Sequence, residues 1–441
     1  MSLIFGRVIL LGFIKFSKNL NLTLQAILFI ILRRLDYRSR SINRAILFFS
    51  LDRLTYWLIL IVLVSIILGL LATEAWAPQL KIIKVIPLIS LIRSLRCLIF
   101  LSTNLLIIYV IFEISVVPIF LIILGWGYQP ERIAARTAIF FYTAACSVPL
   151  LVMLLTLKKF YGSINWNYFF SSLFNGQEID FILITVILFL AFLVKLPIFS
   201  LHIWLPKAHV EAPVYGSIIL AAVMLKLGGL GLTRVLPLAL SLRATVPRAV
   251  RAFGLVTIRL LCVFLFDLKM IVAYSSVAHM ALVVLRVFTR LKFGLIVGLL
   301  IMIRHAFTSS MLFFGVTKIY AQTNRRSILL NSGNLIRNFK FSLLWILTLI
   351  ASIATPPLIN FFREVISFIV VGRVYPLIWP LVILTVFFGG VYSLLIFTST
   401  QHGKLNFKYS KIIIFRKIDF LNRAAHGFLY LPSIFMLIIF F

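Results

Sequence analysis

FLVKLPIFSLHIWLPKAHVEAP, residues 192–213, begins like a membrane helix and then departs from one. A nearly unbroken apolar run, residues 181–194, leads directly into Lys195, which is followed by Leu196 and Pro197. Two histidines, a second lysine and a glutamate come within the sixteen residues after Lys195. An ammonium group is costly in a hydrocarbon environment, so its presence here indicates a wet or functional interior.

The composition as a whole is that of a membrane protein. Of the 441 residues, 62% are hydrophobic and 12% charged, and the mean hydropathy is +1.13. A soluble domain is typically about 45–50% apolar and about 25% charged. Apolar runs long enough to cross a bilayer recur along the chain, which predicts an all-α polytopic membrane protein without a separate soluble domain. The net charge of +32 is expected mainly in basic loops. Nucleic-acid binding is not expected, because the sequence shows no basic domain with interleaved aromatic residues.

The sequence predicts neither a metal site nor a redox cofactor in this chain. Cys97, Cys146 and Cys262 are far apart, and no CxxC pair or glycine-rich nucleotide motif occurs. His209-Val210-Glu211 has too few ligands for a metal site.

About fourteen transmembrane helices are expected, two of them interrupted by proline. Pro197 falls within helix 180–203, and Pro356-Pro357 fall within helix 341–371. Broken helices at corresponding positions of two halves are typical of transporters built from an internal repeat. The expected spans are 2–16, 21–35, 54–73, 82–101, 104–125, 134–158, 180–203, 213–236, 247–265, 269–289, 293–315, 341–371, 377–399 and 426–441.

Four ionisable residues lie deep inside apolar helices: Glu113, Lys195, Lys226 and Glu364. Such residues usually face a bundle interior or a water-filled cavity. One interpretation is that they form ion pairs that only hold helices together. The other is that they carry protons, because burial and the movement of an opposite charge both change proton affinity, as a pump requires.

Proline is expected to bring water to these charges. Pro197 cannot donate a hydrogen bond to the carbonyl of Leu193, and Pro118 leaves the carbonyl of Ile114 free in the same way. Pro356-Pro357 free two further carbonyls. Inside a membrane, freed carbonyls must meet water or polar side chains. Histidines in or beside these helices could extend a wet path or simply pack: His202, His279 and His305.

Several motifs resemble subunit 4 of mitochondrial NADH:ubiquinone oxidoreductase, respiratory complex I. The most specific covers residues 192–235, FLVKLPIFSLHIWLPKAHVEAPVYGSIILAAVMLKLGGLGLTRV. Four others are FEISVVPIFLIILGWGYQPERIAARTAIFFYT (112–143), DLKMIVAYSSVAHM (267–280), ASIATPPLINFFREV (351–365) and TSTQHGK (398–404). The resemblance runs in order from about residue 50 to residue 405. This family is related to subunits of multisubunit cation/proton antiporters.

The resemblance implies a fold of fourteen helices containing two inverted five-helix repeats, each with a proline-broken helix. Residues 1–81 would hold N-terminal transmembrane helices, and residues 82–236 the first antiporter-like repeat. Residues 247–400 would form the second repeat, and residues 401–441 a basic loop and a C-terminal helix. The chain would be a multi-pass subunit in the mitochondrial inner membrane.

The resemblance also implies roles. Glu113 and Lys195 would be the proton-handling pair of the first half, Lys226 the central bridging lysine, and Glu364 the residue that exchanges protons with the outer side. Flavin, iron–sulfur clusters and ubiquinone would belong to other subunits, and the partners would be membrane-arm subunits, including neighbouring antiporter-like ones, and lipid. Two alternatives remain: a subunit of a stand-alone cation/proton antiporter, and a non-pumping structural subunit. The histidines matching the family's polar axis are His202, His279 and His305.

Six arginines depart from the family pattern, because they stand where small or polar residues are usual. A central arginine costs about 2.5–3.5 kcal/mol on insertion scales. Either each reaches water or a partner, or the codons are read differently, since many animal mitochondria read AGA and AGG as serine or glycine and ATA as methionine. Only 8 methionines occur in the chain, which fits the second explanation. It predicts small residues at Arg286, Arg304 and Arg363 in particular. The six are Arg136, Arg259, Arg286, Arg304, Arg363 and Arg373.

Overall fold

The computed structural model is mostly helical in the part of the chain that it describes. The described residues are 79–127, 129–162, 178–236, 248–289, 291–337, 339–353, 355 and 359–403, with five isolated positions between 55 and 65. The predicted helices 2–16, 21–35 and 426–441, and most of 54–73, lie outside them. One isolated antiparallel bridge joins two described residues, Asp267 and Ser327.

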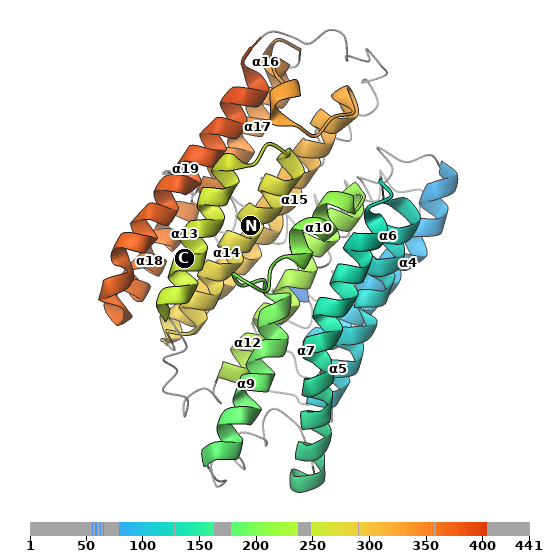
Figure 1. Ribbon diagram of the computed structural model, residues 1–441, viewed down its shortest axis with the longest axis vertical. Coiled ribbons are helices and arrows are strands. Elements are labelled where there is room, and N and C mark those ends of the chain that lie inside the picture. Colours follow the sequence, from blue (N-terminus) through green and yellow to red (C-terminus); the bar gives the residue numbers. More distant parts are fainter. Residues whose placement is uncertain are drawn as a thin grey trace, which may run out of the picture.

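The helices form two groups that lie side by side (Figure 1). The first group comprises α4 (Gln79–Leu101), α5 (Leu105–Ile114), α6 (Val116–Trp126), α7 (Arg132–Tyr161), α9 (Glu178–Lys195), α10 (Trp204–Glu211), α11 (Val214–Ile219), the π-helical segment η1 (Leu220–Met224) and α12 (Leu225–Val235). The second group comprises α13 (Arg248–Phe264), α14 (Leu268–Val287), α15 (Lys292–Thr323), η3 (Ile328–Leu330), α16 (Asn334–Arg337), α17 (Phe339–Ile353), α18 (Ile359–Val374), η4 (Pro376–Ile378) and α19 (Trp379–Gln401).

Six described spans are long and apolar enough to cross a membrane. A helix suits that environment because it satisfies its backbone hydrogen bonds internally. The chain is therefore a multi-pass membrane protein. The spans are Leu105–Trp126, Arg132–Lys159, Val214–Val235, Leu268–Val287, Phe293–Ala321 and Trp379–Gln401.

Burial separates central helices from peripheral ones. In the spans Val214–Val235 and Leu268–Val287, 89% of the most apolar window is buried, whereas the value is 33% for Arg132–Lys159 and for Trp379–Gln401. The central elements join the two groups, since α10 packs on α14, α11 and η1 pack on α15, and α12 packs on both α14 and α15. The outer helices present apolar side chains such as Phe141 to their surroundings.

Both predicted helix breaks are present. α9 ends at Lys195, two residues before Pro197, and the chain becomes helical again at Trp204. The indole nitrogen of Trp204 donates to the carbonyl of Val194 at 3.1 Å, so a side chain satisfies a group that the break leaves free. In the second group α17 ends at Ile353 and α18 begins at Ile359, while Pro356-Pro357 lie outside the described residues.

Three expected helices differ in detail from the structure. The predicted helix 104–125 is divided at Ser115, whose hydroxyl donates to the carbonyl of Phe112 at 2.8 Å. The predicted helix 213–236 contains the π-helical segment η1. The predicted helix 293–315 continues to Thr323 and ends at Asn324, which adopts the left-handed conformation typical of a helix end.

Candidate functional site

The first predicted pair is in contact. The Lys195 Nζ atom lies 3.3 Å from Oε1 of Glu113 and donates to the carbonyl of Phe112, also at 3.3 Å. The same ammonium lies over the Phe112 ring, 2.9 Å from its centroid. Lys195 is 4% exposed, whereas the Glu113 side chain is 27% exposed. The pair thus has a buried cation and a carboxylate open on one side.

Local chain geometry explains why these two groups meet. Lys195 is the last residue of α9, and Glu113 is one residue from the end of α5, so each lies at a helix interruption. The ring of Phe192 packs edge-on against Phe112, with centroids 5.8 Å apart. Two breaks in neighbouring helices therefore place an amine, a carboxylate and backbone carbonyls together inside the first group.

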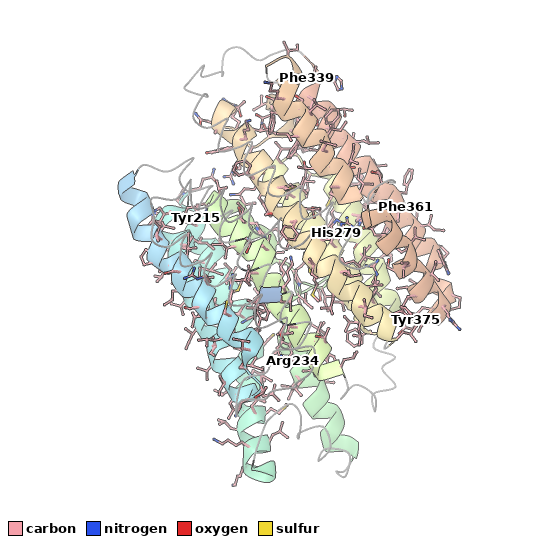
Figure 2. All side chains as sticks on the ribbon, turned by 180° about the vertical axis from the view of Figure 1, so that it is seen from behind. Tyr215, Arg234, His279, Phe339, Phe361 and Tyr375 are labelled. Carbon is pink, nitrogen blue, oxygen red and sulfur yellow. The ribbon has the colours of Figure 1, made fainter. Side chains whose placement is uncertain are left out.

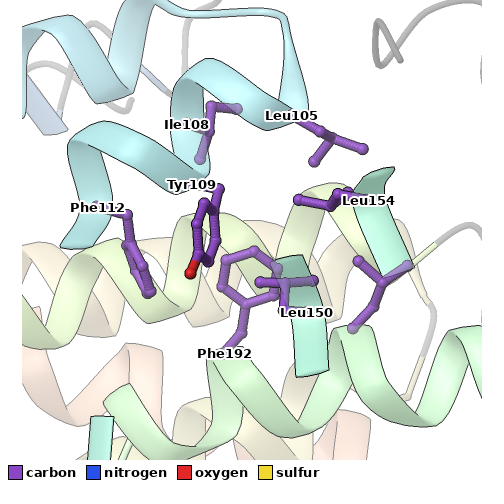
Figure 3. A pocket seen from close by; sticks show the side chains of 8 residues that line it. Leu105, Ile108, Tyr109, Phe112, Leu150, Leu154 and Phe192 are labelled. Atoms are coloured by element: carbon purple, nitrogen blue, oxygen red, sulfur yellow. The ribbon is translucent and has the colours of Figure 1, made fainter. Parts of the chain in front are cut away.

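A small pocket lies beside this pair but is not a ligand site. Its walls include Tyr109, Phe112, Leu150 and Phe192, and its volume is about 10 Å³. Figure 3 shows these side chains converging from different helices. A space of that size holds at most one water and needs several polar partners to do so. Apolar packing therefore fills this side of the pair.

Arg96 is a buried cation near the same pair that the sequence analysis did not single out. Its side chain has no exposed surface, and none of its three guanidinium nitrogens has a hydrogen-bond partner among the described residues. Its charge acts on Lys195. A position on α4 between apolar neighbours gave no signal beyond the charge itself.

Lys226 lies two residues after the π-helical segment. Its Nζ atom donates to the carbonyl of Ala221 at 2.7 Å, and the residue is 1% exposed. A π-helical turn widens the helix and displaces carbonyls from their usual partners, and such turns are frequent at functional sites. The segment thus supplies the carbonyl that holds the lysine inside the bundle.

Gly228 allows α12 to approach the break after α9. A Cβ atom at this position would lie 2.9 Å from both the nitrogen of Leu196 and the carbonyl oxygen of Phe192. Gly231 likewise lies against the Phe192 ring. Small residues permit this closeness between helices in membranes. The element that carries Lys226 is therefore in backbone contact with the turn that follows Lys195.

His279 and His305 face each other across α14 and α15. Their ring centroids are 5.4 Å apart, both side chains are buried, and Nε2 of His305 has no partner among the described residues. Both rings are within electrostatic range of Lys226. Figure 2 shows His279 about midway along the second group, between Phe339 near one end and Tyr375 near the other.

Glu364 forms an ion pair that the sequence analysis did not foresee. Its Oε1 atom accepts from Nη1 of Arg304 at 2.7 Å, and both side chains are buried. The second guanidinium nitrogen of Arg304 donates to the carbonyls of Ala351 at 3.2 Å and Ser352 at 2.9 Å, at the end of α17. Arg304 thus reaches an acidic partner and carbonyls just before the helix break.

The other unusual arginines have varied surroundings. Arg373 is exposed, and the guanidinium of Arg136 lies 4.5 Å from the centroid of the Phe120 ring. Arg259 donates to the carbonyl of Thr385 at 2.8 Å. Arg286 has no exposed surface and donates to the hydroxyl of Ser367, yet its Nε and Nη1 atoms have no partner in the described part of the chain. The side chain of Arg363 lies outside the described residues.

Two further histidines are buried next to the broken helix. His202 lies between Phe199 and Tyr274, with centroid distances of 5.8 Å and 5.7 Å. His209 stacks on Phe313 at 4.5 Å, and neither ring nitrogen has a partner among the described residues. From the sequence alone, His209 was considered only as a metal ligand. No group of three or more His, Cys, Asp or Glu residues that could hold a metal occurs in the part of the chain that the structure describes.

The seven predicted site residues are thus buried or paired, and six of them gather in three places. Glu113 and Lys195 meet in the first group, and Glu364 meets Arg304 in the second. Lys226, on the central helix α12, lies between them in the chain and acts on the paired rings of His279 and His305. His202 remains beside the break after Lys195 and contacts Tyr274 of α14.

Comparisons with known proteins identify relatives that share one name. The chain is 40% identical over 314 residues to NADH-ubiquinone oxidoreductase chain 4 of Locusta migratoria, covering 69% of this chain and 68% of the relative. It is 36% identical over 330 residues to the protein of the same name from Lumbricus terrestris, covering 74% and 73%.

Two solved structures share the fold. One belongs to respiratory complex I from Thermus thermophilus with bound NADH, with a TM-score of 0.79, 22% identity and coverage of 88% of this chain and 81% of that chain. The other belongs to the Mrp complex from Dietzia sp. DQ12-45-1b, with a TM-score of 0.72, 15% identity and coverage of 81% and 67%.

The family model described as "NADH:quinone oxidoreductase/Mrp antiporter, TM" matches residues 102–391, which include all seven predicted site residues. The chain therefore belongs to the NADH:quinone oxidoreductase/Mrp antiporter transmembrane family and, within it, to the NADH-ubiquinone oxidoreductase chain 4 proteins.

Proposed function

We propose that this chain is a proton-translocating, antiporter-like core subunit of respiratory complex I in the mitochondrial inner membrane. The observation that carries the proposal is the contact between buried Lys195 and partly exposed Glu113 at two adjoining helix breaks, in a chain whose relatives are named NADH-ubiquinone oxidoreductase chain 4. NADH oxidation and ubiquinone reduction take place in other subunits, which hold the flavin and the iron–sulfur clusters. The subunit contributes to NADH:ubiquinone reductase activity by coupling that reaction to proton transport.

The first-half pair can alternate between two states. When the Glu113 carboxylate is ionised, it attracts the Lys195 ammonium, and when Glu113 takes up a proton that attraction is lost. Lys195 can then pass a proton inward and accept another, because its proton affinity depends on the charge opposite it. Glu113 is more exposed than Lys195 and is therefore the better placed of the two to exchange protons with water.

The remaining path runs through the centre of the molecule to the second half. Lys226 bridges the two halves, and His279 and His305 relay protons onward to Glu364, which exchanges them with the outer side. His202 supports the same axis beside the first break. The backbone contact at Gly228 and the packing of α12 on α14 and α15 support this order. Neighbouring antiporter-like and other membrane-arm subunits, together with lipid, surround the chain.

A stand-alone cation/proton antiporter is the second candidate function, and the fold shared with the Mrp complex favours it. The names of the curated relatives favour complex I instead. A non-pumping structural subunit would not need an axis of buried charges, whereas Glu113, Lys195, Lys226 and Glu364 are all present in this chain.

The proposal is tested in complex I assembled with variant chains and placed in vesicles. Glu113→Gln and Lys195→Ala should each lower both protons pumped and coupled NADH oxidation, while the complex still assembles. Glu131→Gln and Lys159→Ala change exposed residues of the same charge and serve as matched controls. Normal pumping by either site variant removes that residue from the path, and loss through failed assembly supports a structural role.

A further inference from the structure

The half-helix α10 ends inside the bundle with carbonyl groups that its own helix cannot satisfy. It stops at Glu211, and the next residue, Ala212, is extended and fully buried. Pro213 follows and has no N–H to donate. The last carbonyls of any helix lack partners in the next turn, and a buried helix end therefore needs donors from elsewhere.

Lys269 supplies those donors from the second group. Its Nζ atom donates to the carbonyl of Val210 at 2.8 Å and to that of Ala212 at 2.6 Å, and the residue is 4% exposed. Lys269 lies in the first turn of α14, where the helix dipole disfavours a positive charge. The positive charge of Lys269 is therefore electrostatically unfavourable at the start of α14 and favourable at the end of α10.

A second cation and a buried carboxylate complete the contact. Arg326 donates to the carbonyl of Val210 at 3.2 Å and lies 3.6 Å from a carboxylate oxygen of Glu211. Glu211 is 2% exposed, and neither of its oxygens accepts a hydrogen bond from the residues described. Since the C-terminal end of a helix carries partial negative charge, two cations and one carboxylate balance this buried end.

The cations themselves are held by the backbone. The side chain of Asp267 accepts from the backbone nitrogen of Lys269 at 2.9 Å and so caps α14. The backbone nitrogen of Leu268 donates to the carbonyl of Arg326 at 3.0 Å, and that of Ile328 donates to the carbonyl of Phe266 at 2.8 Å. The start of α14 and the segment after α15 therefore form one fixed unit opposite α10.

We propose that Lys269, Arg326 and Glu211, which we call the α10-end cluster, hold the broken helix of the first half against α14 and thereby position the proton path. α10 begins two residues after His202 of the proposed path, and α14 carries His279. Lys269 is thus a positioning residue, acting through the placement of α10 rather than by carrying protons. The expected effect on proton pumping rests on the proposed function, whereas the contact between Lys269 and the end of α10 can be measured separately.

The test compares Lys269→Met with Lys207→Met in intact complex I. Both remove an ammonium group, but Lys207 is exposed on α10 whereas Lys269 binds its end. Amide hydrogen exchange in peptides covering residues 204–219 should become about tenfold faster in Lys269→Met, because the end of α10 loses its donors. Protons pumped per NADH should fall, the KM for quinone should be unchanged, and Lys269→Arg should restore most of both losses.

Two results would overturn the inference. One is unchanged exchange in residues 204–219. The other is faster exchange with normal pumping, while Glu113→Gln does lower pumping, which would make the cluster a structural tie alone. If the complex with Lys269→Met does not assemble, amide hydrogen exchange and protons pumped per NADH are measured for Glu211→Gln instead. A smaller acceleration of exchange is expected for that variant. If Glu113→Gln pumps normally, the proposed function fails, and the exchange measurement still decides whether the cluster holds α10.

Discussion

The ammonium of Lys195 lies 3.3 Å from the carboxylate of Glu113 and is covered on another side by an aromatic ring. The ring belongs to Phe112, the residue before Glu113, so one turn of α5 provides the anion, the ring and a carbonyl acceptor. A cation held by three different groups can lose one of them without leaving its place. This arrangement allows the protonation of Glu113 to change without displacing Lys195 from the helix break.

The Phe112 ring can be tested apart from the charges. Phe112→Leu should keep the Lys195–Glu113 distance but weaken the hold on the ammonium, since a desolvated cation–π contact contributes about 2 kcal/mol. We expect pumping by the assembled complex to fall several-fold, measured as proton uptake or release per NADH in vesicles. Phe140→Leu, at an exposed position of α7, is the control and should be neutral. Equal pumping by the two variants would show that the ring is only packing.

Lys226 should be indispensable for its charge rather than its bulk. Lys226→Met keeps the length of the side chain and removes the donor to Ala221 and the proton carrier together. We expect assembly to persist and protons pumped per NADH to fall. Pumping indistinguishable from that of the unaltered chain would exclude Lys226 from the path. Lys158→Met, at an exposed position near the end of α7, is the matched control.

The close approach at Gly228 predicts an effect on stability. Gly228→Ala places a Cβ atom 2.9 Å from backbone atoms of Leu196 and Phe192, and backbone cannot move aside as a flexible side chain would. Overpacking of this kind costs about 1–3 kcal/mol. The thermal inactivation temperature of the complex should fall in this variant. Gly125→Ala, where nothing lies within 4 Å, should leave it unchanged, and equal temperatures for the two would contradict the contact.

The buried arginines can be tested by the masses of tryptic peptides. We expect small residues at positions 96 and 286, because among the described residues the Arg96 guanidinium has no hydrogen-bond partner and two nitrogens of Arg286 have none, while neither side chain has exposed surface. Tryptic peptides of the protein isolated from mitochondria should then run through both positions with the mass of serine or glycine. Cleavage after Arg96 and Arg286 would show that the arginines are real.

The same measurement decides the prediction for positions 304 and 363. In the structure Arg304 satisfies its charge through Glu364, as a genuine arginine would. A small residue there would instead leave Glu364 without that fixed partner and free to alternate its protonation. Detection of arginine at 304 would require Arg304→Ala to be tested, with the expectation that Glu364 loses its buried counter-charge and pumping changes.

Apolar runs and prolines allowed most of the described fold to be predicted. The helix breaks near Pro197 and between α17 and α18 follow from chemistry that is local in sequence, and so does the placement of Lys195 at a helix end. The contact between Lys195 and Glu113 was expected as a pair through family resemblance. Its distance, and the enclosing Phe112 ring, depend on how α5 and α9 pack, which no local pattern specifies.

Other features depended on contacts between distant parts of the chain. The π-helical segment at 220–224 has ordinary apolar helix formers and no proline, so its sequence reads as α-helix. Glu211 and Lys269 are far apart in sequence and belong to different groups of helices. Only the fold shows that Lys269 binds the end of the helix that finishes at Glu211. Arg304 and Glu364 likewise meet only because α15 packs on α18.

The π-helical segment has a consequence for how this helix tolerates insertions and deletions. A π-turn contains one residue more than an α-turn, and each residue of an α-helix rotates the following side chains by about 100°. Removing any single residue from Leu220–Met224 would let the segment close into regular α-helix. The faces of Val214–Ile219 and Leu225–Val235 would then keep their present relation, because the deleted residue is the surplus one. Removing a residue from Val214–Ile219 would instead rotate Lys226 away from α14 and α15, so the two kinds of one-residue deletion should differ sharply in outcome.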